Sequence, residues 1–168
     1  MTGALTVRRV DYGDARDAQA LVDLLDAYAR DPAGGGRPLE ARVRAGLPAA
    51  LRARSDAFSV IAWAQEVADA PPCPVGLVNC FEGFSTFACR PLVNVHDLAV
   101  LAGWRGRGVA ARMLALVETI ARERGACKLT LEVLAGNAPA QRAYARAGFA
   151  GYALDPAMGQ AQFLQKLL

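Results

Sequence analysis

The stretch that decides the fold is residues 92–116, which read LVNVHDLAVLAGWRGRGVAARMLAL. The apolar first part predicts a strand, and the last part predicts a helix that begins directly after a loop of glycine and arginine. A helix start leaves its first amide N–H groups without intrahelical partners and carries positive potential from the aligned peptide dipoles. Gly106 and Gly108 permit close backbone approach, and Arg105 and Arg107 add charge. The stretch therefore predicts a cradle for a phosphate or diphosphate.

Three kinds of phosphate-binding loop connect a strand to a helix, and residue spacing separates them. A Walker-type loop requires Lys where Val109 stands, which disfavours nucleotide hydrolysis. The dinucleotide pattern G-x-G-x-x-[GA] is met by residues 106–111, but two glycines and an alanine often coincide by chance, and a Rossmann unit usually opens with this loop. The third pattern, [QR]-x-x-G-x-[GA], is met by residues 105–110.

Residues 105–110 (RGRGVA), preceded by residues 97–100 (DLAV), resemble the acyl-CoA-binding loop of the GNAT superfamily of N-acetyltransferases. Residues 137–149 (NAPAQRAYARAGF) resemble the second signature of that family and follow in the expected order. The resemblance implies an α+β fold with a central mixed, mostly antiparallel sheet of roughly six to seven strands, about four flanking helices and a splayed central parallel pair. It also implies a single N-acetyltransferase domain over residues 1–168.

The resemblance implies acetyl-CoA as the co-substrate and no metal. The loop would hold its diphosphate, and the pantetheine arm would run back along the central strand. The cofactor-binding residues that it implies are Leu98, Ala99, Val100, Arg105, Gly106, Arg107, Gly108, Val109, Ala110, Asn137 and Tyr144.

Attack of a neutral amine on a thioester requires a group that takes a proton from the ammonium, donors for the developing oxyanion and an acid for the leaving thiolate. Tyr144 occupies the tyrosine position of the second signature and is the expected acid; the alternative is a core tyrosine of an amphipathic helix. Asn137 suits a pantetheine amide or a helix N-cap, and it can serve as both.

The base is open. His96, the single histidine, stands on the central strand at one of two places where relatives carry Glu or His; Asn94 stands at the other and cannot accept a proton. An imidazole can relay a proton through water, although a strand histidine is usually structural. Glu82 is a further candidate. Asp97 points away in a regular strand, and a bulge would turn it inward. Asp97, Glu82 and Phe84 are the expected substrate-binding residues.

One other mechanism and two other functional classes are compatible with parts of the sequence. Cys89 or Cys127 as an acyl-carrying nucleophile is disfavoured because no Cys-His pairing motif is present, so direct attack in a ternary complex is expected. A non-catalytic acyl-CoA sensor is the alternative, which Tyr144 disfavours; a nicotinamide enzyme is the third. The acceptor stays open between small amines and protein amino groups, and Asp97 and Glu82 favour a cationic small molecule.

The composition sets outer bounds. A chain of 168 residues with 54% hydrophobic and 21% charged residues is typical of one globular domain. A net charge of +3 with scattered arginines does not indicate nucleic acid. The four cysteines and single histidine match no metal spacing. No secretory segment or membrane-spanning apolar run is seen, so we expect a cytoplasmic protein with free thiols and no membrane partner. The resemblance is compatible with a homodimer.

The remaining patterns predict secondary structure. Helices are expected after a cap at Asp11 or Asp14, over residues 39–54 with a break or kink at Pro48, over residues 106–124 and over residues 138–147. Residues 83–87 are expected to form a loop. Strands are expected at residues 5–10, 57–64, 75–81, 92–101, 128–134, 149–152 and 160–167.

Overall fold

The computed structural model describes residues 4–152, 155, 157, 159 and 161–167, and the chain divides into two compact units, Met1–Leu131 and Glu132–Leu168. The elements of the first unit are β1 (Ala4–Arg9), α1 (Ala15–Arg30), the 3₁₀ turn η1 (Pro32–Gly34), α2 (Ala41–Arg52), β2 (Ala57–Gln65), β3 (Cys73–Ser85), β4 (Arg90–Val100), the 3₁₀ turn η2 (Ala102–Trp104), α3 (Val109–Glu123) and β5 (Leu129–Leu131). The second unit contains α4 (Ala138–Arg146).

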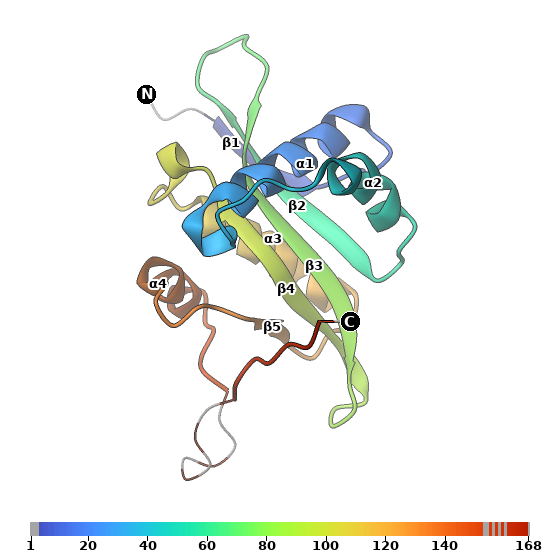
Figure 1. Cartoon of the computed structure of the whole chain (residues 1–168), viewed down its shortest axis with the longest axis vertical. Helices are drawn as coiled ribbons and strands as arrows, with labels where there is room; N and C mark the ends of the chain where they lie inside the picture. Colours follow the sequence, from blue (N-terminus) through green and yellow to red (C-terminus); the bar gives the residue numbers. More distant parts are fainter. Residues whose placement is uncertain (1–3, 153–154, 156, 158, 160, 168) are drawn as a thin grey trace. The chain divides into compact units, whose positions relative to one another are not determined.

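The first unit is built on a five-stranded sheet in the order β1-β2-β3-β4-β5 (Figure 1). Neighbours from β1 to β4 pair antiparallel, whereas β4 and β5 pair parallel. A parallel pair needs a crossover connection, and α3 supplies it. The expected mixed, mostly antiparallel α+β architecture with a parallel pair is confirmed.

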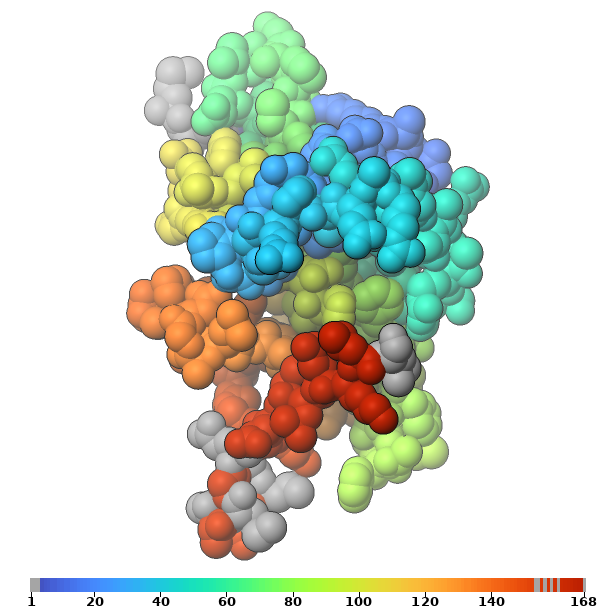
Figure 2. All heavy atoms as spheres, in the orientation of Figure 1, coloured from blue at the N-terminus to red at the C-terminus, as the bar shows by residue number. Residues whose placement is uncertain are grey.

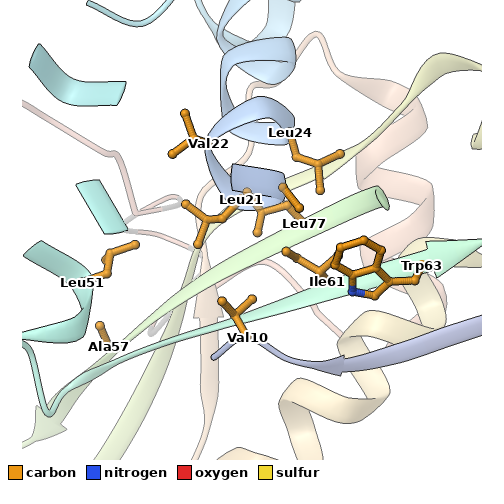
Figure 3. Packing of buried hydrophobic residues seen from close by; sticks show 10 residues of the cluster. Val10, Leu21, Val22, Leu24, Leu51, Ala57, Ile61, Trp63 and Leu77 are labelled. Carbon is orange, nitrogen blue, oxygen red and sulfur yellow. The ribbon is translucent and has the colours of Figure 1, made fainter. Parts of the chain in front are cut away.

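Helices cover both faces of the sheet. The face that carries Ala57, Ile61 and Leu77, here called the α1 face, packs against α1 and α2. Figure 3 shows Leu21 and Leu24 of α1 over these strands, and in Figure 2 the segment from α1 to α2 (blue to cyan) forms one continuous layer. The opposite face, here called the α3 face, carries fully buried valines of β2, β3 and β4 and packs against α3. The apolar stripes of the helices thus enclose the alternating strand residues from two sides.

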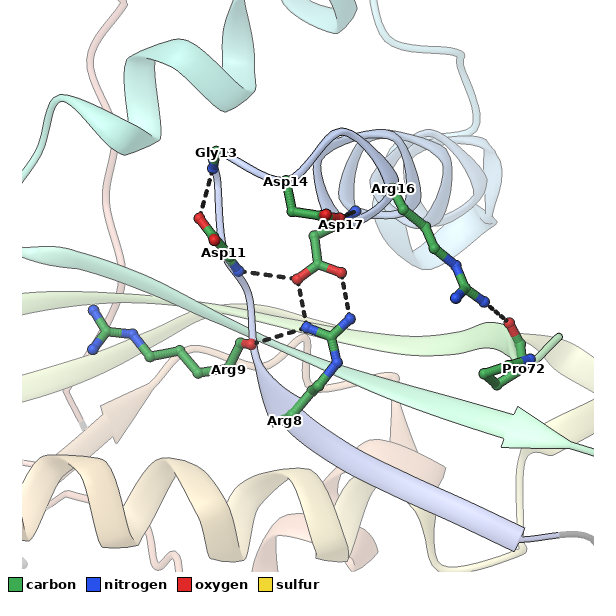
Figure 4. A network of polar contacts seen from close by, with 8 residues as sticks. All are labelled: Arg8, Arg9, Asp11, Gly13, Asp14, Arg16, Asp17 and Pro72. Carbon is green, nitrogen blue, oxygen red and sulfur yellow. Dashed lines mark hydrogen bonds and ion pairs between the residues drawn. The ribbon is translucent and has the colours of Figure 1, made fainter.

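A buried carboxylate fixes the connection between β1 and α1 (Figure 4). The predicted cap is present, because Asp14 accepts a hydrogen bond from the Asp17 N–H at 2.9 Å. The Asp17 carboxylate is 1% exposed and binds the Arg8 guanidinium through two 2.5 Å contacts and the Asp11 N–H at 3.0 Å. Burial alone would raise the pKa of Asp17, but the hydrogen bonds from Arg8 and Asp11 outweigh it, so that the pKa lies below its usual range.

The second helix and the segment before it are held onto α1 by Asp26. Its carboxylate accepts from the Leu39 N–H at 2.8 Å, from Arg30 at 2.9 Å and from Arg44 at 3.1 Å. A break or kink was expected at Pro48; the break was wrong, since α2 is continuous from Ala41 to Arg52. Proline removes one backbone hydrogen bond, and packing of the apolar side of α2 on the core compensates for that loss.

Several strand boundaries differ from expectation. β3 and β4 form a hairpin that extends past β2, so residues 83–85 are strand rather than loop. The sheet has five strands in the described residues, fewer than the six to seven expected. Residues 149–152 and 161–167 form no strand; one long backbone contact, from Ala161 N–H to the Tyr152 carbonyl at 3.4 Å, is too little for a ladder. Gln160 lies outside the described residues. Across the described ranges, no helix combines the length and apolar character needed to cross a bilayer.

Candidate active site

The loop before α3 has the backbone geometry of an anion cradle. Gly106 and Gly108 have φ values of 73° and 77°, which L side chains rarely adopt. A Cβ built at either glycine meets nothing within 4 Å, so the space above the loop is open. Gly108 is the N-cap of α3 and provides no side-chain cap, which leaves the first amides of α3, from Val109 onward, for another acceptor.

Both arginines of this loop make contacts in the folded chain. Arg105 donates from Nε to the Val100 carbonyl at 3.0 Å and from Nη2 to Asp31 at 2.8 Å. Arg107 lies over the Trp104 ring, 4.8 Å from its centroid. The hydrogen bond from Arg105 is the main cause that holds the pKa of Asp31 below its usual range. The loop therefore carries two oriented guanidinium groups beside open space.

The central strand contains a bulge at His96. On β3, Cys80 lies opposite Val95 and its neighbour Asn79 lies opposite Asp97, so that His96 has no partner in the register. Because directly opposed residues share a sheet face, Val95 lies on the α3 face and Asp97 on the α1 face. A regular strand would have put both on the same face. The bulge that was expected to turn Asp97 to the other face of the strand is thus present.

The parallel partner of β4 ends at the same place. β5 pairs with β4 only at Val93, Asn94 and Val95, while β4 continues to Val100. From the bulge onward, the edge of β4 that faces β5 has no strand partner in the described sheet. Exposed backbone groups on such an edge can pair with an extended ligand, as expected for the pantetheine contacts at Leu98, Ala99 and Val100.

His96 and Asp97 lie together on the α1 face. The His96 ring packs edge-on against Phe81 with 5.4 Å between centroids, and Phe81 shares the face of Asn79. Burial raises the pKa of Tyr28 on α1, and the negative charges of Asp97 and Asp31 raise it further, which places both carboxylates in the vicinity of its phenol. An acidic side chain, an imidazole and a phenol are therefore grouped under the end of α1.

Glu82 and Phe84 are not grouped with them. Glu82 lies on the α3 face, because it is opposite Val93, and its carboxylate pairs with Arg124 at 3.3 Å. Phe84 is opposite Pro91 in the extended part of the hairpin and is 60% exposed. Neither residue is grouped with His96 and Asp97. The expected roles of Glu82 as base and substrate contact, and of Phe84 as substrate contact, stay predictions.

The second unit holds the other two candidates. Asn137 caps α4 by accepting from the Ala140 N–H at 3.2 Å, so its capping role is confirmed. Tyr144 packs edge-on against Phe149, with 6.0 Å between ring centroids. The roles of Asn137 toward pantetheine and of Tyr144 as the acid stay predictions.

The thiols offer no built nucleophile. Cys80 is buried, and burial raises the pKa of its thiol to about 12, which makes a thiolate rare at neutral pH. Cys89 is exposed at the tip of the β3–β4 hairpin. In the described ranges, no group of three or more His, Cys, Asp and Glu side chains is arranged to hold a metal.

Three polar residues that sequence reasoning passed over connect to Asp97. Asn79 contacts it directly, Ser59 contacts Asn79, and Tyr12 contacts Ser59. A signal was available, because Ser59 and Asn79 each interrupt an otherwise apolar strand, AFSVIAWA and VGLVNC. A polar residue at a buried strand position requires a hydrogen-bond partner.

Comparison with known proteins agrees with this geometry. Residues 19–149 match the family described as Acetyltransferase (GNAT) family. The streptothricin acetyltransferase of Streptomyces lavendulae is 41% identical over 80 residues, which are 48% of this chain and 42% of that protein. The matched stretch is thus less than half the length of that relative.

Solved structures share the fold at low sequence identity. Aminoglycoside N-acetyltransferase AAC(6')-Iy in complex with CoA has a TM-score of 0.72 at 15% identity, covering 99% of this chain and 97% of the other. A ribosomal-protein-alanine N-acetyltransferase from Brucella melitensis biovar Abortus 2308 has a TM-score of 0.69 at 18% identity, covering 98% and 100%. Fold, glycine loop and family match coincide over the same residues, and the chain therefore belongs to the GNAT family of acetyltransferases.

Proposed function

We propose that this GNAT protein moves an acetyl group from acetyl-CoA to a primary amine of a small cationic molecule, by direct attack in a ternary complex. The observation that carries the proposal is the bulge at His96, which turns Asp97 to the α1 face at the point where β4 loses its parallel partner. We also propose that residues 1–168 act as one N-acetyltransferase domain. The family match supports this, because it spans both compact units.

The loop residues fit the CoA diphosphate. The uncapped amides from Val109 onward, the positive φ values of Gly106 and Gly108 and the charges of Arg105 and Arg107 suit a bound anion. Acetyl-CoA supplies a thioester carbonyl to the amine. The edge of β4 from Leu98 to Val100, which has no strand partner in the described sheet, would orient the pantetheine arm.

The chain's own residues would then move two protons. We propose that His96 accepts the proton from the attacking ammonium, directly or through water, and that Asp97 binds and orients that cation. Tyr144 would donate a proton to the sulfur as the carbon–sulfur bond breaks and the carbon–nitrogen bond forms, and the second proton that the nitrogen loses on becoming an amide would return to the phenolate. Glu82 is less suited to act as the base, because its carboxylate is engaged by Arg124 on the opposite face.

The acceptor class follows from charge and from the relatives. Asp97 supplies a negative charge on the α1 face near Tyr28, which favours a cationic amine, whereas the charge of Asp31 is paired with Arg105. The matched relative is named for streptothricin, and AAC(6')-Iy is named for aminoglycosides. A protein amino group is the second candidate acceptor, for which the shared fold of the ribosomal-protein-alanine enzyme is the supporting observation.

Thiol release from acetyl-CoA, with product detection by mass, tests the proposal. The panel would contain streptothricin, sisomicin, spermidine and a peptide with an N-terminal alanine. We expect a gain of one acetyl group on a small polycationic amine, and a Tyr144→Phe variant with kcat reduced about 10- to 100-fold at unchanged CoA affinity. CoA binding without acetylation of any of these amines would favour a sensor, and turnover of the peptide alone would favour a protein acceptor.

A further inference from the structure

A chain of four polar side chains crosses the α1 face of the sheet and ends at Asp97. The Tyr12 hydroxyl lies 2.8 Å from Ser59 Oγ, Ser59 Oγ lies 2.6 Å from Asn79 Oδ1, and Asn79 Nδ2 lies 3.0 Å from Asp97 Oδ2. The residues come from the segment after β1 and from β2, β3 and β4. Three strands thus each contribute one member at neighbouring register positions.

The direction of every hydrogen bond follows from the chemistry of the groups. A carboxylate only accepts, so the Asn79 amide nitrogen must face Asp97 and its oxygen must face Ser59. Asn79 Oδ1 accepts, so Ser59 uses its single proton there, and the Tyr12 hydroxyl must donate to Ser59 Oγ. All donors therefore point along the chain toward the carboxylate. Hydrogen bonds aligned in this way polarise one another in a low-dielectric interior.

The middle of the chain is rigidly enclosed. Ser59 is 0% and Asn79 is 4% exposed, whereas Asp97 is only partly buried at the open end. Burial raises the pKa of Tyr12, so its phenol stays protonated and continues to donate at neutral pH. Ser59 and Asn79 are buried polar groups at strand positions surrounded by mostly apolar side chains, which is costly unless they are paired, and here each is paired.

We propose that Tyr12, Ser59 and Asn79 are positioning residues that hold the Asp97 carboxylate in one orientation to bind the ammonium group of the acceptor. The inference deepens the proposed function and rests on it. Asn79 fixes one carboxylate oxygen and leaves the other for the ligand, while the bulge at His96 aims the side chain under α1. The charge of Asp97 also acts on the Tyr28 phenol of α1, whereas the buried Cys80 thiol lies on the opposite, α3 face beside Val95.

Calorimetric titration of streptothricin, and separately of sisomicin, into CoA-saturated protein tests this without requiring turnover. Asn79→Leu should weaken binding of the amine about tenfold, because the carboxylate loses its charged hydrogen bond. Ser59→Ala should weaken it about threefold, Tyr12→Phe less, and Ser59→Thr, which keeps the hydroxyl, should restore most of the affinity. The dissociation constant of CoA should not change in any of these variants.

Controls separate positioning from a general loss of structure. Ser85→Ala removes another buried hydroxyl, at the far end of the β3–β4 hairpin, and should leave amine affinity unchanged. If Asn79→Leu does not fold, the single-hydroxyl variants Ser59→Ala and Tyr12→Phe carry the test. If the wild-type protein acetylates the amine, the Asn79→Leu variant should have a higher KM for the amine and an unchanged KM for acetyl-CoA.

The outcomes distinguish the inference from the function. Wild-type affinity for the amines in all folded variants, or absence of amine binding by the wild-type protein, would overturn the inference. Amine binding that depends on Asn79 and Ser59, without acetylation of any amine, would support the inference and reject the proposed function.

Discussion

Arg105 of the glycine loop pairs with Asp31 at the end of α1, with 2.8 Å between Nη2 and Oδ2. The same guanidinium binds the Val100 carbonyl at 3.0 Å. Arg105, which is expected to contact the CoA diphosphate, therefore binds both Val100, the last residue of β4, and Asp31 at the end of α1. Both Arg105 and Asp31 connect the two halves of the proposed site.

Asp31→Asn should tighten CoA binding. The diphosphate and Asp31 compete for one guanidinium, and removal of the carboxylate charge removes that competition. Exposed pairs of this kind are worth up to about 1 kcal/mol, so we expect a two- to fivefold lower Kd for CoA. Calorimetry at low and high salt measures it, and the gain should shrink with salt. Weaker binding in the variant would show instead that Asp31 orients Arg105 for the ligand.

Gly108→Ala should weaken both folding and CoA binding. The φ of 77° at this N-cap strains any L side chain, which should cost about 1 kcal/mol of stability or distort the first amides of α3. CoA affinity should fall about tenfold or more. Gly46→Ala is the matched control, because Gly46 lies inside α2 with free space around its Cβ position; that change should stabilise the protein by up to about 1 kcal/mol. Equal CoA affinity in both variants would argue against the loop as the diphosphate site.

Serine variants should show that no cysteine carries the acetyl group. Cys89→Ser and Cys127→Ser should retain kcat within about twofold if the amine attacks the thioester directly. Intact-mass measurement after mixing with acetyl-CoA alone should find no acetylated protein. In the same assay an alkylating reagent should modify the exposed Cys73 and Cys89 first, whereas the buried Cys80, with a pKa of about 12, should react only after unfolding. A stable acetyl-cysteine on the route to product would contradict direct transfer.

Asp17→Asn should lower the free energy of unfolding at neutral pH, and this loss should shrink as the pH falls. The pKa of Asp17 is lowered in the folded chain, so its contribution is complete above the usual carboxylate range and is lost as pH falls through the folded value. Because Arg8 is 46% exposed, we expect a modest loss of about 2 kcal/mol near pH 7. The free energies of unfolding of both proteins, measured in urea, should converge once the pH falls below the lowered pKa of Asp17. A difference that does not shrink in acid would show that the effect is steric.

The glycine loop and the family could be predicted from the sequence because they depend on local features. The strand, the loop with Gly106 and Gly108, and the helix follow one another in the sequence. The spacing of apolar residues predicts where the strand and the helix lie. The cap at Asp14 was predictable for the same reason. Glycine permits the positive φ values that this loop needs, and aspartate is favoured at an N-cap, so residue identity is informative at these positions.

The polar chain on the α1 face depends on register, which the sequence does not state. Asn79 meets Asp97 only because β3 and β4 pair with a shift at His96, and a single-residue change in register would move Asp97 to the other face. Glu82 illustrates the same point in reverse. It was expected near the acceptor, yet its parity along β3 puts it beside Arg124 under α3. The identity of the acceptor likewise depends on which side chains the fold brings together, and the sequence does not state this.

A crystal structure of the protein with CoA would show directly whether the glycine loop holds the diphosphate. We expect diphosphate oxygens within hydrogen-bond distance of the amides at Gly108, Val109 and Ala110, with the pantetheine along β4 and the thiol beside the bulge at His96 and Asp97. CoA bound away from this loop, or a thiol that ends on the α3 face beside Glu82, would contradict this expectation.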